Sequence, residues 1–471
     1  MVFSSHIFLF YFLPLALLTY YALPSCARHL ALTLLSYLFY GWSNPAFCLL
    51  MLTSTCIDFW AGRTIARRGL QDPRDRFQKR ALALSVASNL TLLGIFKYFN
   101  FGLENYNALV AALGLESLRW DTLLRVTLPL GISFYTFQSI SYTVDVYRGQ
   151  ARPMKNFIDF ACYVSMFPQL VAGPIVRFHE ISEQLRRRCH TLEKFARGVA
   201  FFSLGMAKKI LLANPCGKVA DICFEAGSRG VVEAWYGLTA YAFQIYFDFS
   251  GYSDMAVGLG LMLGFAFPRN FDRPYLSQSI SEVWRRWHMS LSRWLRDYLY
   301  IPLGGNRKGA ARTDVNLMLV MVLGGLWHGA AWNFLLWGAF HGVLLLAERK
   351  AGSSLYPWLP RPLRVAATFV LMCLSWVFFR AQDLPSATAY FADLFALGSP
   401  QAGAALLPGL VFQPYYLLCF AAAVAVWVCR DSWEFTERLT TVKAAACLGL
   451  LAASVVLMTV QSYNPFIYFI F

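Results

Sequence analysis

Apolar runs long enough to cross a bilayer recur along the whole chain, and they constrain the fold more than any other feature. A transmembrane helix needs about 20 apolar residues. Runs of this kind begin near residues 3, 29, 45, 81, 123, 157, 195, 235, 316, 331, 363, 410 and 441. Several are short or polar enough to be re-entrant or interfacial, so we expect about 11 spans. The pattern predicts an all-α polytopic membrane protein.

The amino-acid composition agrees with this pattern. The chain has 58% hydrophobic and 14% charged residues, whereas soluble domains average roughly 45–50% apolar and about 25% charged residues. Because no apolar-poor stretch is long enough for a separate soluble domain, we expect one membrane-embedded domain over residues 1–471. Its motif-rich core lies at about 81–345, and further helices follow over 346–471. The first run, residues 3–23, has no basic region before it, which predicts a retained anchor.

Basic residues give the chain a formal charge of +15, which raises the question of nucleic-acid binding. They concentrate in short connections between apolar runs, as Lys and Arg do in cytoplasmic loops. Residues 62–80 and 177–197 are such connections, and we expect both on the cytoplasmic side. Residues 381–408 contain no Lys or Arg and are expected on the opposite side. The placement predicts contact with membrane lipids and no nucleic-acid partner.

Two of the seven histidines, His328 and His341, lie deep in an apolar stretch over residues 318–342. Ionisable groups inside a membrane are costly and usually face a cavity or a partner. A neutral imidazole can accept a proton from a hydroxyl or thiol near neutral pH. Three glycines flank His328 and permit close approach of backbone or substrate: Gly324, Gly325 and Gly329. His328 is therefore the first catalytic candidate, and a hydrogen-bonded packing role between helices is the alternative.

Asp248 and Asp254 form a second polar group within the apolar stretch Gln244–Gly260. One interpretation is local: the carboxylates cap broken helix ends or pair with an arginine. The other has them line a polar tunnel or orient a histidine. Six residues separate them, so a straight helix does not place both on one face. We expect them to support the site without direct catalysis.

The segment over residues 281–302 predicts an amphipathic interfacial helix that ends at Pro302. At about 100° per residue one apolar stripe forms. It contains Trp284, Trp287, Leu291, Trp294, Leu295 and Tyr298, and the other side carries Arg285, Arg286, Arg293 and Arg296. His288 is expected near the border of the stripe. A turn-rich cationic loop, Leu303–Gly309, follows.

Common soluble-enzyme signatures are absent from the sequence. It has no GxxxxGK[ST] loop, no HExxH and no GxSxG, so phosphoryl transfer, zinc proteolysis and hydrolase chemistry lack their motifs. The 11 cysteines form no CxxC pair and are expected to be small buried hydrophobes. No matching pair of broken apolar segments indicates an inverted-repeat transporter. We expect no metal site.

Six segments together resemble one family. They are MVFSSHIFLFYFLP, LPLGISFYTFQSISYTVDVYRG, FPQLVAGPIVRF, QIYFDFSGYSDMAVGLGLMLGF, EVWRRWHMSLSRWLRDYLYIPLGGNRKG and GGLWHGAAWNFLLWGAFHG. In this order they resemble the membrane-bound O-acyltransferase family, and more narrowly its bacterial branch that acetylates exopolysaccharides such as alginate and cellulose. The likeness runs from residue 1 to about 345. Beyond that point only the hydropathy is similar.

The resemblance implies a fold and a set of roles. The family fold is a ring of helices around a central funnel, with a tunnel between the two membrane faces. The family's histidine in WHG corresponds to His328, and the histidine in RRWH corresponds to His288. The donor is implied to be a cytoplasmic thioester such as acetyl-CoA, bound as a substrate with no resident cofactor. His328 acts either as a general base or through a transient acetyl-histidine.

Further expectations concern the donor and the partner. Five cations near the interface are candidates for the phosphates of acetyl-CoA, and contact with lipid headgroups is the alternative. They are Arg285, Arg286, Arg293, Arg307 and Lys308. The resemblance implies a bacterial inner-membrane location and a periplasmic or membrane-anchored transferase that completes the modification. The competing hypotheses are a family member acting on peptidoglycan, teichoic acid or lipid, and a conduit or scaffold of a secretion complex without bond chemistry.

Overall fold

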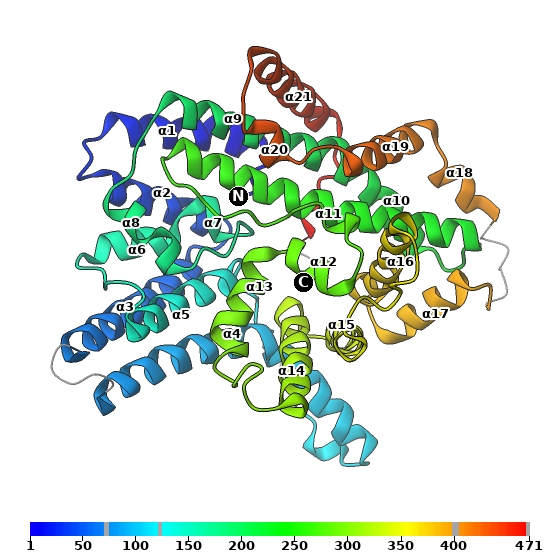
Figure 1. The fold of residues 1–471 in the computed structure, drawn as a ribbon, viewed down its shortest axis with the longest axis horizontal. Helices are drawn as coiled ribbons and strands as arrows, with labels where there is room; N and C mark the ends of the chain where they lie inside the picture. The colour runs from blue at the N-terminus through cyan, green and yellow to red at the C-terminus, as the bar shows by residue number, and fades with distance from the viewer. Residues whose placement is uncertain (70–74, 121–124, 398–404, 468–471) are drawn as a thin grey trace. The chain divides into compact units, whose positions relative to one another are not determined.

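The computed structural model describes residues 1–69, 75–120, 125–397 and 405–467, and every regular element in these ranges is helical (Figure 1). This confirms the prediction of an all-α protein. The chain divides into two compact units: unit 1 is Met1–Val2 and His6–Cys189, and unit 2 is Phe3–Ser5 and His190–Phe471. The expectation of a single domain over residues 1–471, with a core at 81–345, stays a prediction.

Unit 1 carries the first apolar runs. Its helices are η1 (Phe8–Phe12), α1 (Leu13–Ala22), α2 (Arg28–Gly41), α3 (Ala46–Gly69), α4 (Arg76–Ala112), η2 (Glu116–Leu118), α5 (Ile132–Arg148), α6 (Phe157–Ser165), α7 (Phe167–Leu170) and α8 (Phe178–Arg186). The Phe12 ring lies 5.2 Å from Phe167 and 5.5 Å from Phe39, so aromatic pairs join η1, α2 and α7. Asp58 of α3 is fully buried and accepts hydrogen bonds from Ser85 and Asn89 of α4. Aromatic packing and a satisfied polar group therefore hold this unit together.

Unit 2 carries the remaining helices. They are α9 (Leu192–Ala207), η3 (Lys208–Ala213), α10 (Asn214–Glu225), α11 (Val231–Met262), η4 (Pro274–Leu276), α12 (Ile280–Arg286), α13 (Met289–Leu295), η5 (Arg296–Tyr300), α14 (Ala310–His328), α15 (Trp332–Ala351), α16 (Arg361–Arg380), α17 (Leu384–Leu394), α18 (Leu407–Val411), α19 (Pro414–Val428), α20 (Ser432–Thr436) and α21 (Thr441–Val460). Every residue of α11 from Ala240 to Met262 is buried. A helix segment that is buried on all sides lies in a core, and α11 is the central helix of this unit.

Glycines allow α9 and α11 to pack in direct backbone contact. A Cβ atom on Gly205 would lie 2.4 Å from the carbonyl oxygen of Gly251, and one on Gly198 would lie 2.7 Å from that of Gly258. Small residues permit such close approach between helices in membranes, where van der Waals packing replaces hydrophobic driving force. The glycines of the α11 motif therefore set the helix spacing in the core.

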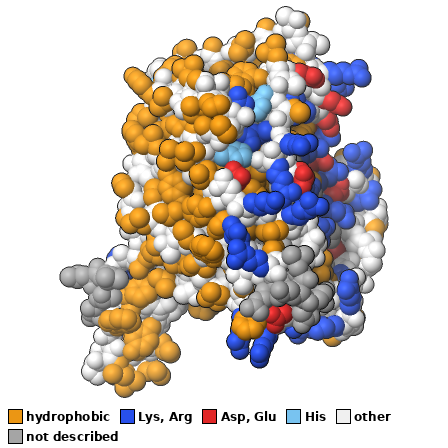
Figure 2. Space-filling model, turned by 90° about the vertical axis from the view of Figure 1, so that its left-hand side faces the viewer, with side chains coloured by type: hydrophobic (Ala, Val, Ile, Leu, Met, Phe, Trp, Pro, Cys, Tyr) orange, Lys and Arg blue, Asp and Glu red, His pale blue; other side chains and the backbone are white. Residues whose placement is uncertain are grey.

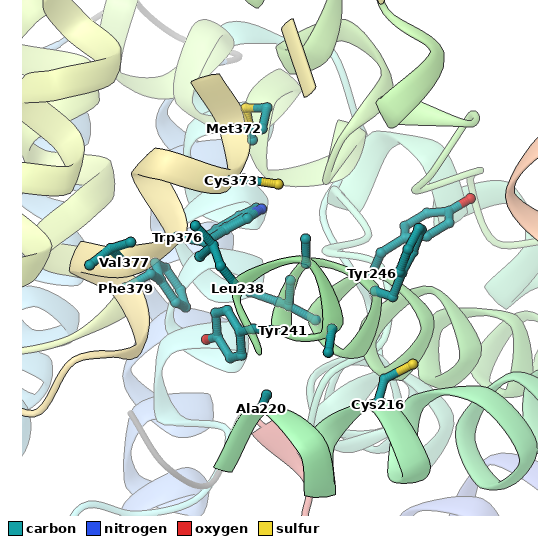
Figure 3. Packing of buried hydrophobic residues seen from close by; sticks show 14 of the residues in the cluster. Cys216, Ala220, Leu238, Tyr241, Tyr246, Met372, Cys373, Trp376, Val377 and Phe379 are labelled. Atoms are coloured by element: carbon teal, nitrogen blue, oxygen red, sulfur yellow. The ribbon is translucent and has the colours of Figure 1, made fainter. Parts of the chain in front are cut away.

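An aromatic cluster joins α10, α11 and α16 in the core of unit 2. Figure 3 shows Tyr241 of α11 near Trp376 and Phe379 of α16, and Tyr246 of α11 on the other side of that helix, near Cys216 of α10. These side chains are all buried. The cluster fixes α16 against α11, and this packing brings two α16 rings to the candidate active site described below.

Three described helices are long and apolar enough to cross a membrane by length and composition: α4, α16 and α21. Many large apolar side chains are exposed, and Figure 2 shows a broad hydrophobic area beside a band of Lys and Arg side chains. Such surfaces suit a lipid environment with charged groups at its border. The predicted count of about 11 spans and their ring arrangement are not confirmed by these helices.

The prediction of one continuous helix over residues 281–302 is wrong. The chain forms α12, breaks at Trp287 and His288, resumes as α13 and η5, and then enters the turn before Pro302. His288 has φ 42°, a left-handed conformation that is unfavourable for a residue with a side chain. The backbone carbonyl of Asn270 accepts a hydrogen bond from the Met289 N–H at 2.9 Å, which stabilises the break. The apolar periodicity of residues 281–302 fits a straight helix and gives no sign of the break. The contact that breaks the helix comes from Asn270, in a loop that precedes this segment.

Candidate active site

His328 ends α14, at the tip of a tightly packed pair of helices. A Cβ atom on Gly325 would lie 2.2 Å from the carbonyl oxygen of Phe334, and one on Gly329 would lie 2.1 Å from the Phe334 ring. Gly329 is extended, which ends α14 and turns the chain toward α15. Close approach was predicted for three glycines, and it occurs at Gly325 and Gly329. At Gly324 the nearest atom would lie 3.5 Å away, an ordinary contact.

Aromatic rings surround the His328 imidazole. The ring centres of Trp327, Trp337 and Phe379 lie 5.0, 5.2 and 5.3 Å from it, all in edge-on arrangements. The side chain is 9% exposed. It lines a cavity of about 10 Å³ together with Ile245, Phe249, Trp287, Trp337, Trp376, Phe379 and Ile467. This volume is close to the space needed for one water molecule, so the histidine lies in a nearly closed apolar cage.

His288 lies beside this cage. Its ring centre is 6.5 Å from that of His328, and the Phe249 ring packs edge-on against it at 4.6 Å. The fold therefore brings together two histidines that were predicted from separate segments. The polar contact of the His288 ring is with Asn270 and not with His328. The His288 side chain is 1% exposed, so it is not at the border of an interfacial stripe as expected.

The contact with Asn270 determines which ring nitrogen of His288 carries the proton. The His288 Nδ1 atom lies 3.2 Å from Asn270 Oδ1, which also accepts hydrogen bonds from the N–H and the hydroxyl of Ser290. An amide oxygen only accepts, so Nδ1 carries the proton and Nε2 keeps its lone pair. The bend at His288 lies outside the spanning helices, and burial lowers the pKa of His288 to about 3. His288 is therefore neutral at pH 7, and its Nε2 is an acceptor.

Asp248 and Asp254 pair with lysines of η3 and with neither histidine. Lys208 Nζ lies 2.7 Å from Asp254 Oδ2, and Ser432 donates a hydrogen bond to the same oxygen. Lys209 Nζ lies 2.8 Å from Asp248 Oδ1. The local interpretation, in which the carboxylates form ion pairs, agrees with these contacts, although the partners are lysines and not an arginine. Asp248 and Asp254 both lie on one continuous helix, α11, so they do not cap broken helix ends. Their support of the active site stays a prediction.

The five candidate donor-binding cations lie on the broken segment and the loop after it. Arg285, Arg307 and Lys308 are exposed, and Arg293 is half-buried. Arg286 is half-buried and lies 2.6 Å from Glu282 in an ion pair one turn away. All five therefore keep exposed or partly exposed cationic groups, with Arg286 engaged by Glu282, and donor binding stays a prediction.

His341 lies one ring away from His328. It is fully buried between Trp284 and Trp337, with ring centres 5.1 and 4.9 Å away, and Trp337 separates it from His328. The described residues hold no group of three or more His, Cys, Asp or Glu side chains that could bind a metal ion. The arrangement offers imidazole chemistry in a dry pocket.

Sequence reasoning missed several parts of this site. Asn270 and Ile467 carried no motif, and nothing in the spacing predicted that either lies near a histidine. Lys208 and Lys209 are adjacent charges within an apolar run of the sequence. Because burying a charged side chain in a membrane costs free energy, this pair indicates that carboxylate partners lie nearby. The remaining lining residues are ordinary apolar core positions.

Residues 115–355 match the sequence profile of MBOAT, the membrane-bound O-acyltransferase family, and this range contains both histidines and most of the cage. The chain belongs to this family. A probable alginate O-acetylase, AlgI, of Pseudomonas putida is 44% identical over the full length of both chains. The corresponding protein of Azotobacter vinelandii is 43% identical, also over both full lengths. A peptidoglycan O-acetyltransferase of Helicobacter pylori is 32% identical over all of this chain and 98% of its own.

These comparisons confirm the resemblance inferred from the motifs. The chain is a membrane-bound O-acyltransferase of the O-acetyltransferase type, a multi-pass protein of the bacterial inner membrane. The full-length matches also extend past residue 345, where the motifs ended and only hydropathy was similar. The last described residue of the cage, Ile467, lies in this extension and outside the family profile.

Proposed function

We propose that this O-acyltransferase acetylates an exopolysaccharide, with alginate as the acceptor polymer. The observation that carries the proposal is the 44% identity, over both full lengths, with a probable alginate O-acetylase. Full coverage at 32% identity links the chain to a peptidoglycan O-acetyltransferase, which makes peptidoglycan the second candidate acceptor. Family membership favours bond chemistry over a conduit or scaffold role. Cellulose, teichoic acid and lipid rank behind these two acceptors.

The proposed reaction is the attack of an acceptor hydroxyl on an acetyl thioester. His328 accepts the hydroxyl proton as the new oxygen–carbon bond forms, and the carbon–sulfur bond breaks. The thiolate leaves and takes up a proton, so the products are an acetyl ester and a free thiol. The apolar cage favours a neutral imidazole that is able to act as the base. His288 lies close enough to act on the same reacting group, with its Nε2 as the acceptor.

The donor and the partner complete the proposal. We assign the donor as acetyl-CoA or another cytoplasmic acetyl thioester, with its phosphates on Arg285, Arg293, Arg307 and Lys308. These cations keep exposed or partly exposed groups, which suits contact with a large anionic cofactor-like substrate. The attacking hydroxyl then belongs to a carrier or to a separate periplasmic or membrane-anchored transferase, and that transferase passes the acetyl group from the first ester to a hydroxyl of the polymer. Asp248 and Asp254 support the site by neutralising the buried Lys209 and the half-buried Lys208.

The test is the amount of polymer-linked acetyl ester in cells that lack the endogenous protein. Wild type, His328→Ala and His328→Gln are compared at matched membrane levels. We expect at least a hundredfold loss in both variants, because a general base typically contributes about 10²–10⁴-fold to the rate. Glutamine keeps size and polarity but not the basic nitrogen. Near-normal acetylation in His328→Gln would refute proton transfer by His328.

The acceptor is tested in the same cells. Ester acetyl is measured separately on alginate and on peptidoglycan after the two polymers are purified. Acetyl that appears on peptidoglycan alone would replace alginate with the second candidate.

A further inference from the structure

The segment after α21 is half-buried or exposed at first and ends in the core of unit 2. Residues Gln461–Phe466 have no regular secondary structure, yet Phe466 is 5% exposed and Ile467 is 2% exposed. In Figure 1 this red segment descends from α21 past α10 and α11. The Phe466 ring packs against Tyr252 of α11, with ring centres 4.4 Å apart. We call residues 461–467 the C-terminal strap.

Polar side chains of the core hold the strap by its backbone. Asn214 donates a hydrogen bond to the carbonyl oxygen of Tyr463 at 3.2 Å, and Lys209 donates one to that of Pro465. Asp248 accepts a hydrogen bond from the Ile467 N–H at 2.9 Å. Irregular backbone buried at membrane depth needs such partners, because its polar groups have no helix to satisfy them.

The ion pair between Lys209 and Asp248 is explained by this role. The two side chains are 2% and 1% exposed, and burying a charge pair is costly unless additional hydrogen bonds satisfy the remaining polar atoms. Here those hydrogen bonds are made to the strap, one by each partner. The pair therefore fixes the backbone on either side of Phe466 and sets where the Ile467 side chain lies.

Ile467 is one wall of the His328 cavity. Among the described residues that line it, the others come from α11, α14, α15, α16 and the break after α12, and Ile467 alone comes from the strap. The lining is apolar apart from the histidine, as expected for a pocket that receives the hydrocarbon part of an acyl group. The cavity of about 10 Å³ has little spare room, so the Ile467 side chain is positioned to limit what enters.

We propose that Ile467 determines the acyl size that this enzyme transfers, and that Lys209 and Asp248 position it. The inference rests on the proposed function, since it concerns the acyl group placed at His328. The cavity has room for about one water molecule, so an acetyl group at His328 already requires a small movement of the lining side chains, and a longer group requires Ile467 to move further. A shorter side chain leaves room for one more methylene beside the histidine, and the selectivity for acetyl falls.

The experiment is a competition between two donors. Membranes that contain the full chain and its partner transferase receive an equimolar mixture of acetyl-CoA and propionyl-CoA with the acceptor polymer. Ester-linked acyl groups are released with mild alkali and counted by mass spectrometry. The propionyl-to-acetyl ratio is the ratio of the two kcat/KM values, so a variant that folds less well still reports selectivity.

We expect Ile467→Ala to raise the ratio about tenfold, the lower end of the effect of one methylene in a fitted pocket. Ile467→Leu conserves volume and should leave the ratio within about twofold of wild type. The matched control is Ile95→Ala, at an α4 side chain that is 49% exposed, which should not change it. A fall in total transfer with an unchanged ratio in Ile467→Ala would show that the strap is only structural and would overturn the proposal.

The positioning role has its own variant. Lys209→Met combined with Asp248→Leu removes both charges at similar volume and leaves no lone buried ion. The ratio should rise here as well, because the backbone beside Ile467 loses two partners. An unchanged ratio would overturn the role of the ion pair. Wild-type membranes that form no polymer ester from either donor would instead refute the proposed function, which separates the two failures.

Discussion

Two adjacent glycines of α14 offer a sharp test of how His328 is positioned. Gly325 faces the backbone of α15, and an added Cβ atom would lie 2.2 Å from the Phe334 carbonyl oxygen and 3.1 Å from Gly338 backbone atoms. Gly324 points elsewhere, and its added Cβ atom would meet only the Leu295 Cδ1 atom at 3.5 Å. Gly325→Ala and Gly324→Ala therefore make the same chemical change, one residue apart, in different surroundings.

The expected difference follows from these contacts. Alanine in place of glycine within a helix stabilises it by roughly 0.5–1 kcal/mol, which both variants gain. Overpacking typically costs about 1–3 kcal/mol, and at Gly325 the obstructing atoms are backbone that cannot rotate away. We expect Gly324→Ala to be neutral or slightly stabilising and Gly325→Ala to be destabilising. The gap between their free energies of unfolding should be about 1–3 kcal/mol, since the helix gain cancels.

The assay combines stability and activity. Melting of the detergent-solubilised protein should be lower for Gly325→Ala by about 1–3 °C, at roughly 1 °C per kcal/mol for a chain of this size. Polymer acetylation at matched membrane levels should also fall, because the α14–α15 contact sets the place of His328 in its cage. If Gly325→Ala matches Gly324→Ala in melting and in activity, close helix packing does not position the histidine.

Two further predictions concern charge. Burial lowers the pKa of His288 from 6.5 to about 3. Between these pH values the unfolded chain therefore binds a proton that the folded chain does not. The free energy of unfolding should fall as the pH drops below 6.5, by up to about 1.4 kcal/mol per pH unit. Melting temperatures of wild type and His288→Gln across this range check it, and equal slopes would contradict it. Arg285→Gln and Arg293→Gln should raise the KM for acetyl-CoA several-fold at low salt and less at high salt, with kcat unchanged. The exposed Arg125→Gln is the control, and a KM that does not depend on these two arginines would assign them to lipid headgroups.

The fold class was predictable from the sequence for physical reasons, and so was the place of His328 inside an apolar run, while its catalytic role stays a prediction. Long apolar runs have few solutions other than membrane helices, and a histidine inside such a run must have a reason to be there. The WHG segment also contained the glycines that bring α15 against α14, so the local environment of His328 followed from adjacent residues. By contrast, the span count depends on tilt, length and burial of each helix, which hydropathy alone does not determine.

The features that could not be predicted depend on contacts between distant segments. The 281–302 segment has a helical apolar stripe, and Trp287, Leu291 and Trp294 are indeed buried. The break at His288 arises because Asn270, far along the chain, binds the backbone and side chains around it. A left-handed residue costs of order 1–3 kcal/mol and persists only when its surroundings enforce it. Periodicity carries no information about such an external contact.

The ionisable groups near the cage are of two kinds, ion-paired side chains and histidines, and the two kinds have different roles in the proposed mechanism. The buried carboxylates Asp248 and Asp254 are each matched by a lysine, so neither contributes net charge near the cage. Among the described residues that line the cage, His328 is the side chain with a basic ring nitrogen, and His288 lies beside it. A charged residue in the same place would draw water into the pocket, where the water would compete with the acceptor hydroxyl for the acetyl group of the proposed thioester donor. In the proposed mechanism the Lys209–Asp248 pair therefore holds the strap, and proton transfer falls to His328 in an apolar cavity that Ile467 of the strap helps to close.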